Sequence, residues 1–217
     1  MRLAALLLLS VSLPLGGQTP PSETWRFDRL DRLGNHPTQV EGSPRIIETP
    51  QGKAVSFDGV RDALFVDVHP LAGAETFTLE VIFRPAADGR PEQRFFHLQE
   101  TGSQTRLLLE TRLLPGGWCL DSFAASRTGS QTLIDRTKLH SLGAWHHVAM
   151  VYDGKTFRHF VDGVSQGEAV VALAPQAAGR TSVGVRINRV DYFKGEILTA
   201  RMSRRALPVS KFLPLPR

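Results

Sequence analysis

A two-residue alternation over residues 76–84, TFTLEVIFR, constrains this chain more than any other feature. Successive side chains of a β-strand point to opposite faces of its sheet, so such a run sorts its residues into two sets. One face carries only apolar side chains, which are Phe77, Leu79, Val81 and Phe83. The other face carries Thr78, Glu80, Ile82 and Arg84. The pattern predicts a strand that Pro85 ends and that turns one face toward a hydrophobic core.

Short runs of the same kind recur along the chain, separated by turn residues. They predict roughly a dozen strands, over residues 54–58, 64–68, 76–84, 93–100, 105–113, 118–124, 133–134, 145–152, 157–161, 169–173, 182–187 and 193–202. Asp-Gly pairs at 58–59, 153–154 and 162–163 favour the left-handed backbone of tight turns. The run at 145–152 is apolar on both faces, which is typical of the centre of a sheet. With no convincing helix, this spacing indicates an all-β sandwich or barrel.

The N-terminal segment differs from the rest. A positive start, Met1-Arg2, precedes an almost wholly apolar run over residues 3–15, and glycines and polar residues follow. This is the layout of a secretory signal peptide over residues 1–17. An uncleaved anchor or a buried core helix is the alternative, although an apolar run this short falls below the roughly 20 residues that span a bilayer. We therefore expect export to the periplasm or the outside of the cell, with residues 18–217 as one mature domain and no membrane span.

The ends of that domain carry weaker signals. Residues 18–23 and 213–217 are expected to be loose ends. Residues 25–44 lie outside the runs above, although Trp25, Phe27 and Leu30 are able to supply another strand.

Charge and cysteine content limit the classes of partner and the disulfides that we expect. The chain has 26 basic and 21 acidic residues, and the basic residues are spread out apart from Arg201, Arg204 and Arg205. No basic stripe interleaved with aromatic residues is present, so we expect no nucleic-acid partner. The single cysteine, Cys119, excludes an internal disulfide. We expect a buried, inert thiol there, with a disulfide to a second partner as the alternative.

Three groups of motifs resemble one known family. The runs WHHVA (145–149), VYDG (151–154) and FVDG (160–163) resemble the W-x-H-V-A, Y-D-G and Y-V-D-G signature of laminin G-like domains. Upstream runs VSFDG and FTLE, and downstream runs FKGEI and RAL, are similar to the opening and closing motifs of that family. The matches lie in order over about residues 53–212. The resemblance implies a concanavalin A-like jelly roll, an antiparallel two-sheet β-sandwich, but no particular function, because this fold hosts lectins, adhesion modules and glycanases.

The residues of the first motif have structural interpretations. Trp145 starts a buried strand and is expected to anchor the core, with ligand stacking as the alternative. His146 and His147 are neighbours on a strand and point to opposite faces, so they cannot chelate one metal ion together. We expect His147 to be a hydrogen-bonded structural residue.

Catalytic motifs are absent from the sequence. Concanavalin A-like glycanases carry an E-x-D-x-E run that places carboxylates on one strand face for acid and nucleophile work, and this chain has none. G-x-S-x-G, H-E-x-x-H, P-loop and C-x-x-C motifs are also missing. We expect a protein without enzymatic activity.

One hairpin presents a candidate ligand-binding site. Residues 107–124 fold back at Pro115-Gly116-Gly117, and a two-residue turn there places a polar set on one face: Glu110, Arg112, Cys119 and Asp121. The opposite face, expected to be core, carries Leu107, Leu109, Leu113, Trp118 and Leu120. The carboxylates and the guanidinium of Glu110, Arg112 and Asp121 are able to bind a glycan or a cation. The alternative is cross-strand charge pairing on a solvated sheet, and catalytic use of the carboxylates is a third reading.

We expect no cofactor, with calcium as the alternative. Related folds often hold calcium through aspartates at a rim, and Asp62, Asp67 and Asp135 are candidates, although a turn-forming role is expected for each.

The resulting prediction is a secreted binding module for a carbohydrate or another cell-surface ligand. Tyr192 and Phe193, beside a loop, are the expected exposed aromatic residues for sugar stacking. A structural or adhesion module that binds another protein is the alternative, and a glycan hydrolase is a third class.

Overall fold

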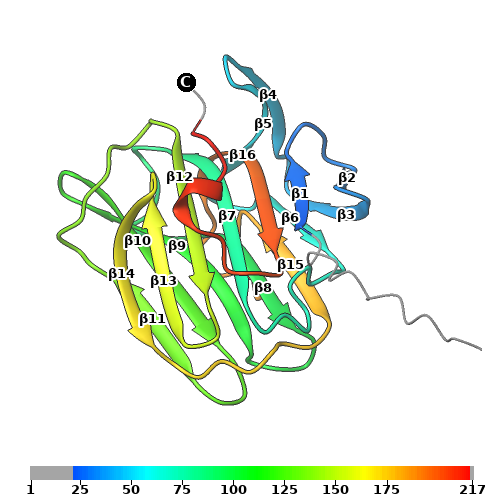
Figure 1. Ribbon diagram of the computed structural model, residues 1–217. Coiled ribbons are helices and arrows are strands. Elements are labelled where there is room, and N and C mark those ends of the chain that lie inside the picture. Colours follow the sequence, from blue (N-terminus) through cyan, green and yellow to red (C-terminus); the bar gives the residue numbers. More distant parts are fainter. Residues whose placement is uncertain (1–21, 216–217) are drawn as a thin grey trace, which may run out of the picture.

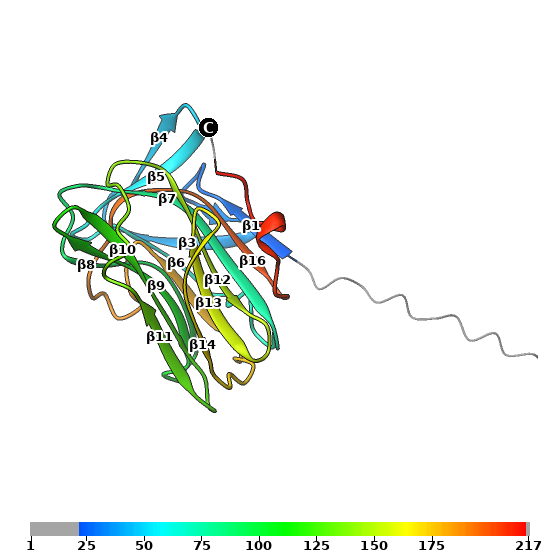
Figure 2. The same cartoon turned by 60° about the vertical axis from the view of Figure 1, so that its left-hand side comes forward.

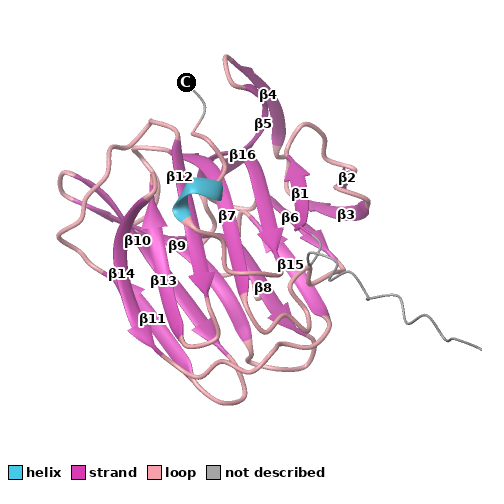
Figure 3. Ribbon diagram, in the orientation of Figure 1, coloured by secondary structure: helices cyan, strands magenta, loops and turns pink. Residues whose placement is uncertain are grey.

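The computed structural model describes residues 22–215, and the leader predicted over residues 1–17 lies outside them. Within this part the chain forms sixteen strands and one short 3-10 helix (Figures 1 and 3). The elements are β1 (Ser22–Arg26), β2 (Arg32–Leu33), β3 (His36–Glu41), β4 (Arg45–Thr49), β5 (Gly52–Asp58), β6 (Ala63–Val66), β7 (Phe77–Pro85), β8 (Glu92–Glu100), β9 (Arg106–Leu114), β10 (Gly117–Ala125), β11 (Ser130–Ile134), β12 (His146–Tyr152), β13 (Thr156–Val161), β14 (Val164–Val170), β15 (Gly179–Val183), β16 (Lys194–Ser203) and η1 (Val209–Lys211). No helix among the described residues is long and apolar enough to cross a membrane.

The strands form two antiparallel sheets that pack face to face. The first sheet has the order β14-β13-β12-β7-β16-β5-β4, with β1 also beside β16. The second sheet has the order β11-β10-β9-β8-β15-β6-β3-β2. Figure 2 separates the two layers, with β8 to β11 on one side and β7, β12 and β16 on the other. The predicted two-sheet sandwich is confirmed, and β12 lies inside its sheet as expected.

The core fills the space between the two inner faces. All four apolar residues predicted to face inward from β7 belong to it. Phe83 stacks on Phe95 with ring centroids 4.4 Å apart, and its edge contact with Trp118 measures 5.1 Å. Each fully buried side chain of this size contributes roughly 1.5 to 3 kcal/mol by leaving water. The alternation of β7 thus fixes both its register and its place at the centre of the sandwich.

Turn residues set the hairpins as the sequence predicts. Leu114 pairs with Gly117, so the β9–β10 turn is Pro115-Gly116, and Gly116 has a φ of 96°. Between β13 and β14, Asp162 and Gly163 both have positive φ, 51° and 77°. Two positive values in succession define the hairpin turn whose twist matches that of its strands.

Several expectations about strand limits are wrong. Ser22 and Glu23 are not a loose end, because they pair with β16 as part of β1. Trp25 lies in the same strand and is fully buried, so the prediction that it can supply another strand is confirmed. β14 starts at Val164 rather than at residue 169, because the tight turn before it leads directly into the next strand.

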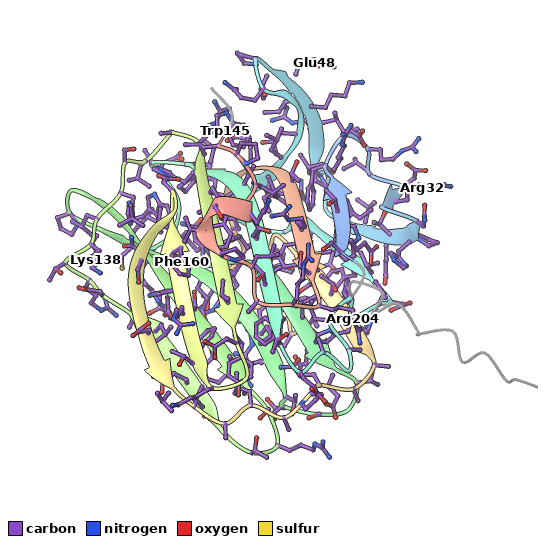
Figure 4. The ribbon with its side chains drawn as sticks, viewed as in Figure 1. Arg32, Glu48, Lys138, Trp145, Phe160 and Arg204 are labelled. Carbon is purple, nitrogen blue, oxygen red and sulfur yellow. The ribbon has the colours of Figure 1, made fainter. Side chains whose placement is uncertain are left out.

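Trp145 does not anchor the core. It is only partly buried and packs on the outer face of the first sheet, with the Arg84 guanidinium 5.0 Å from its ring centroid. Figure 4 shows it at the upper end of β12. The tryptophans of the central core are Trp25 and Trp118, both fully buried.

After β16 the chain crosses the outer face of the first sheet. We call residues 204–215 the C-terminal strap, and Figure 1 shows its red helical turn in front of β12 and β7. Phe212 of the strap lies over Phe160 and His147, with ring centroids 5.3 and 5.4 Å away. The backbone N–H of Leu213 donates to Glu80 at 2.7 Å, so the expectation of a loose end from residue 213 is wrong there.

Candidate binding face

The predicted site residues lie together on the outer face of the second sheet. Asp121 of β10 is opposite Glu110 of β9, and Cys119 is opposite Arg112. The other set of residues on this hairpin faces the core, as predicted: Leu107, Leu109, Trp118 and Leu120 belong to it, and Leu113 packs against it. The hairpin therefore separates a polar outer side from an apolar inner side.

Glu110, Arg112 and Asp121 are joined by short ion pairs. Arg112 Nε and Nη2 lie 2.8 and 2.6 Å from Asp121 Oδ2. Arg112 Nη2 is also 3.0 Å from Glu110 Oε2. One guanidinium thus serves two carboxylates across the hairpin, through charge-assisted hydrogen bonds that are stronger than neutral ones.

Three further residues, which the sequence did not single out, complete this group. Arg94 Nε lies 2.8 Å from Glu110 Oε2, and Arg94 also pairs with Asp191. Arg112 pairs in addition with Glu92. We call the six residues the ion network: Glu92, Arg94, Glu110, Arg112, Asp121 and Asp191.

A β-bulge explains why Arg94 escaped prediction. The register of β8 against β9 shifts between Arg94 and Phe96, so Phe95 is an extra residue, and both phenylalanines face the core. Arg94 and His97 consequently share the outer face although they are three positions apart. A bulge breaks the two-residue period, and the adjacent phenylalanines were the only signal of it in the sequence.

The three predicted residues of the ion network are buried although they lie on an outer face, whereas Glu92 and Asp191 at its edge are 53% and 29% exposed. Only 6% of the Glu110 side chain, 5% of Asp121 and 13% of Arg112 are exposed. Burial and the neighbouring charge of Asp121 raise the pKa of Glu110. Burial acts to lower the pKa of Arg112, but its hydrogen bond to Asp121 and the charge of Asp121 raise that pKa on balance. Cross-strand charge pairing is therefore present, but not on a solvated sheet.

Beside the ion network lies a group of basic side chains. The Arg106 guanidinium lies over the ring of Phe123, 4.4 Å from its centroid. His97 is fully buried, and its Nδ1 accepts a hydrogen bond of 3.0 Å from the backbone N–H of Ile187. Ile187 belongs to residues 184–193, which we call the covering loop because it folds back over this face.

The covering loop is tied down at several points. Its two ends meet where the Phe193 N–H donates to the Gly184 carbonyl at 2.8 Å. Gly184 has a φ of 81°, and a Cβ there would lie 2.4 Å from the ring of Phe57, so no other residue fits. Tyr192 is partly buried and donates to Glu41 at 3.0 Å, while Phe193 is fully buried in the core. The expectation that Tyr192 and Phe193 form an exposed aromatic platform is therefore wrong.

The aspartates considered for calcium have separate roles. Asp62 accepts hydrogen bonds of 2.7 and 3.1 Å from two backbone N–H groups. Asp135 caps a turn by accepting from the N–H of Thr137 at 3.0 Å, whereas Asp67 pairs with Arg180 at 2.6 Å. Among the described residues, no group of three or more His, Cys, Asp or Glu side chains is arranged to hold a metal ion.

The neighbouring histidines of β12 point to opposite faces, as predicted. His146 Nδ1 lies 2.8 Å from Asp162 Oδ2, and its ring makes an edge contact with Trp118. His147 Nε2 lies 3.1 Å from Glu80 Oε1 on the outer face of the first sheet. The prediction that His147 is a hydrogen-bonded structural residue is confirmed.

Solved structures with the same architecture include domains described by what they bind. The chain is similar to domain 4 of AbnA, a GH43 extracellular arabinanase from Geobacillus stearothermophilus, in complex with arabinotriose, with TM-score 0.65, 18% identity, and coverage of 89% of this chain and 97% of that one. It is also similar to the binding domain of Paraclostridial Mosquitocidal Protein 1, with TM-score 0.65, 14% identity, and coverage of 87% of this chain. The match spans 50% of that toxin chain.

A third similar structure is the heptameric SAP-like pentraxin from Limulus polyphemus, with TM-score 0.57, 17% identity, and coverage of 72% of this chain and 77% of that one. A search of curated proteins by sequence finds no match. At these identities the structural matches establish the fold.

A family model establishes the relationship at the level of sequence. Residues 58–211 match the laminin G family model that is described as the concanavalin A-like lectin/glucanases superfamily. That span is most of the chain, and it contains the turn motifs, both sheets' central strands and the ion network. The chain therefore belongs to the concanavalin A-like lectin/glucanase superfamily, as a laminin G-like jelly-roll domain.

Proposed function

We propose that this chain is an exported, non-catalytic binding module that recognises a glycan through the outer face of its second sheet. One observation carries the proposal: the fold matches, nearly end to end, a domain that was solved with arabinotriose bound. That domain belongs to an extracellular enzyme, which fits the signal peptide that residues 1–17 predict.

The two outer faces differ in their availability to a ligand. The C-terminal strap covers the central strands of the first sheet, where Phe212 packs on Phe160. On the outer face of the second sheet, Arg106 and Phe123 are partly exposed, and so is Arg186 of the covering loop. An aromatic ring beside polar side chains is the usual composition of a sugar-binding surface, since sugars present both C–H groups and hydroxyls.

The ion network supports binding better than it supports catalysis. Glycoside hydrolysis needs two carboxylates with access to the substrate, one of them free to give and take a proton. Glu110 and Asp121 share the same guanidinium and are almost completely shielded from solvent. We propose that Glu110, Arg112 and Asp121 shape the binding face and, through Arg94 and Asp191, hold the covering loop in place.

Recognition of another protein is the second candidate. β14 is an edge strand of the first sheet, and Val164 and Val170 on it are 64% and 71% exposed. Exposed apolar side chains on a sheet edge are features of surfaces that add a strand from a partner.

Affinity measurements with purified chain distinguish these functions. We expect a glycan array, followed by titration calorimetry with arabinotriose as the first probe, to give saturable binding without release of reducing sugar. The variant Glu110→Gln/Asp121→Asn keeps the side-chain shapes and removes the charges, and it should weaken glycan binding at least tenfold. Glu48→Ala, on the exposed β4–β5 hairpin, is the matched control and should leave binding unchanged.

Three outcomes would count against this proposal. Release of reducing ends would make the chain a hydrolase. Absence of any glycan ligand, together with a co-purifying protein whose binding Val170→Asp abolishes, would favour the adhesion module. Unchanged glycan binding in the folded double variant, verified by its circular dichroism spectrum, would remove the ion network from the binding face.

A further inference from the structure

Two buried N–H groups on the outer face of the second sheet have no acceptor among the described residues. They are Nε of Arg106 and Nε2 of His97. Because His97 Nδ1 accepts a hydrogen bond from Ile187, the proton of the neutral ring must be on Nε2. Leaving a buried donor without an acceptor is energetically costly, so two of them on one face call for an acceptor that the described chain does not supply.

The His97 ring is held neutral where it lies. Burial, together with the positive charges of Arg186 and Arg106, lowers the pKa of His97 to about 3. At physiological pH the ring is therefore a neutral donor rather than a cation.

Arg186 adds a third donor group at the same place. It precedes Ile187 in the covering loop, and its guanidinium makes no hydrogen bond or ion pair with any residue of the described chain. Burial and the charge of Arg186 lower the pKa of Arg106, so the two positive groups lie within each other's field. Arg106 itself donates only to its neighbour Gln104, at 2.8 Å.

The charge of Glu110 acts on Arg106, but neither Arg106 nor Arg186 has a carboxylate of its own at ion-pair distance among the described residues. The carboxylates of the ion network are already shared between Arg94 and Arg112. Two partly buried guanidinium groups without carboxylate partners repel each other and attract an anion. The ion network contains four carboxylates and two guanidinium groups, whereas no carboxylate of the described residues forms an ion pair with Arg106 or Arg186.

We propose that Arg106, Arg186 and His97 form a subsite for the carboxylate of an acidic sugar. This inference rests on the proposed glycan-binding function and names the ligand class. A carboxylate between the two guanidinium groups would accept hydrogen bonds from both, with His97 as the buried donor behind them. Planar guanidinium forks match carboxylates, and the adjoining Phe123 ring offers an apolar surface to the C–H groups of the sugar.

A matched pair of sugars tests the subsite. Titration calorimetry with a galacturonic acid trisaccharide and with its carboxyl-reduced, neutral counterpart should show at least tenfold tighter binding of the acid. Arg186→Gln should abolish that difference, because it removes one of the two guanidinium groups that would hold the carboxylate, and Arg186 makes no hydrogen bond or ion pair that the described chain would lose. Arg45→Gln, which removes an exposed arginine of β4, is the control and should change affinity less than twofold.

Nuclear magnetic resonance of the His97 ring gives a second, independent reading. In the free chain the proton should be on Nε2, and addition of galacturonic acid should shift its signal as the N–H gains an acceptor. Galactose at the same concentration should cause no shift.

The outcomes separate this inference from the proposed function. Equal affinity for the acidic and neutral trisaccharides, or unchanged affinity in Arg186→Gln, would overturn the subsite and leave a glycan-binding module. Equal affinity for a glutamate-rich peptide would overturn the sugar as the ligand. A galacturonate-dependent His97 shift in a chain that binds no oligosaccharide would keep the anion site and overturn the glycan-binding function.

Discussion

Two glutamates, Glu80 and Glu110, occupy equivalent places on the two outer faces, but their pKa values are shifted in opposite directions. Each lies in the interior of its sheet, on β7 and β9, and each is buried. Burial acts to raise the pKa of both. In Glu80, hydrogen bonds from His147, Arg201 and Leu213 outweigh it and lower the pKa, whereas in Glu110 burial and the charge of Asp121 prevail and raise it.

The difference lies in how donors are distributed over the carboxylate oxygens. Glu80 Oε1 accepts from His147 and Leu213 at 3.1 and 2.7 Å, and Oε2 accepts from Arg201 at 2.6 Å. Both guanidinium groups reach Glu110 at Oε2, and one of them is shared with Asp121. A buried carboxylate is stabilised when each oxygen has its own donors and is destabilised when it competes for them.

The largest effect should follow from breaking the Glu80 cluster. Glu80→Ala leaves Arg201 and His147 without their carboxylate under the C-terminal strap. We expect the free energy of unfolding to fall by about 3 to 5 kcal/mol. Urea unfolding of the purified chain measures it. Glu48→Ala, whose side chain is 77% exposed, is the control and should be nearly neutral. If the free energy of unfolding fell as little as in the control, the contacts of Glu80 with Arg201, His147 and the strap would not stabilise the fold.

A smaller effect is expected from the apolar side of the same strap. Phe212→Ala removes a half-buried ring from His147 and Phe160, and should cost about 1 to 2 kcal/mol, less than the 3 to 5 kcal/mol of a fully buried phenylalanine. Limited proteolysis should cut the strap of this variant faster, while Leu215→Ala, at the exposed end, should be cut at the original rate. Equal cleavage rates would contradict the packing described for Phe212.

Glu110→Gln should change the free energy of unfolding least, by about 1 kcal/mol or less. Both arginines that reach Glu110 keep other carboxylate partners, which are Asp191 for Arg94 and Asp121 and Glu92 for Arg112. The sign of this change should depend on pH. A raised folded-state pKa favours the protonated form, so the stability that Glu110 contributes is present at low pH and lost as pH rises through that pKa. Relative to wild type, Glu110→Gln should therefore gain stability as pH increases.

Glu80→Gln should show the reverse trend. The lowered pKa of Glu80 means that its contribution is present above the ordinary value of 4.5 and lost as pH falls through the folded-state pKa. The free energy of unfolding of this variant should therefore approach that of wild type as the solution is made more acidic. Urea titrations between pH 3.5 and 7 at constant ionic strength compare the three proteins, and parallel stability curves would contradict the contrast between the two carboxylates.

The fold was predictable because its signals are local. The alternation of residues 77–83, the Asp-Gly turns and the Pro115-Gly116 turn each specify backbone geometry within a few residues. These signals predicted most strands from β5 onward and the polar side of the β9–β10 hairpin. They did not predict β2, β3 and β4, which are short and largely exposed, so their sequences carry little apolar pattern.

The environment of the site was not predictable in the same way. Glu110, Arg112 and Asp121 were found because one hairpin holds all three. Arg94 escaped because of the bulge at Phe95, and His97 and Arg186 meet only because the covering loop folds across β8. Burial of charged residues on an outer face depends on such distant segments, which no local pattern encodes.

Both described ends of the chain lie on the first sheet, where β1 pairs with β16 and the strap runs over β12 (Figure 1). A tag, tether or neighbouring domain joined at either end would therefore leave from that side of the sandwich. The outer face of the second sheet would then point away from the attachment and toward the surrounding solution. Immobilisation on a sensor surface through either terminus should leave the proposed ligand face accessible.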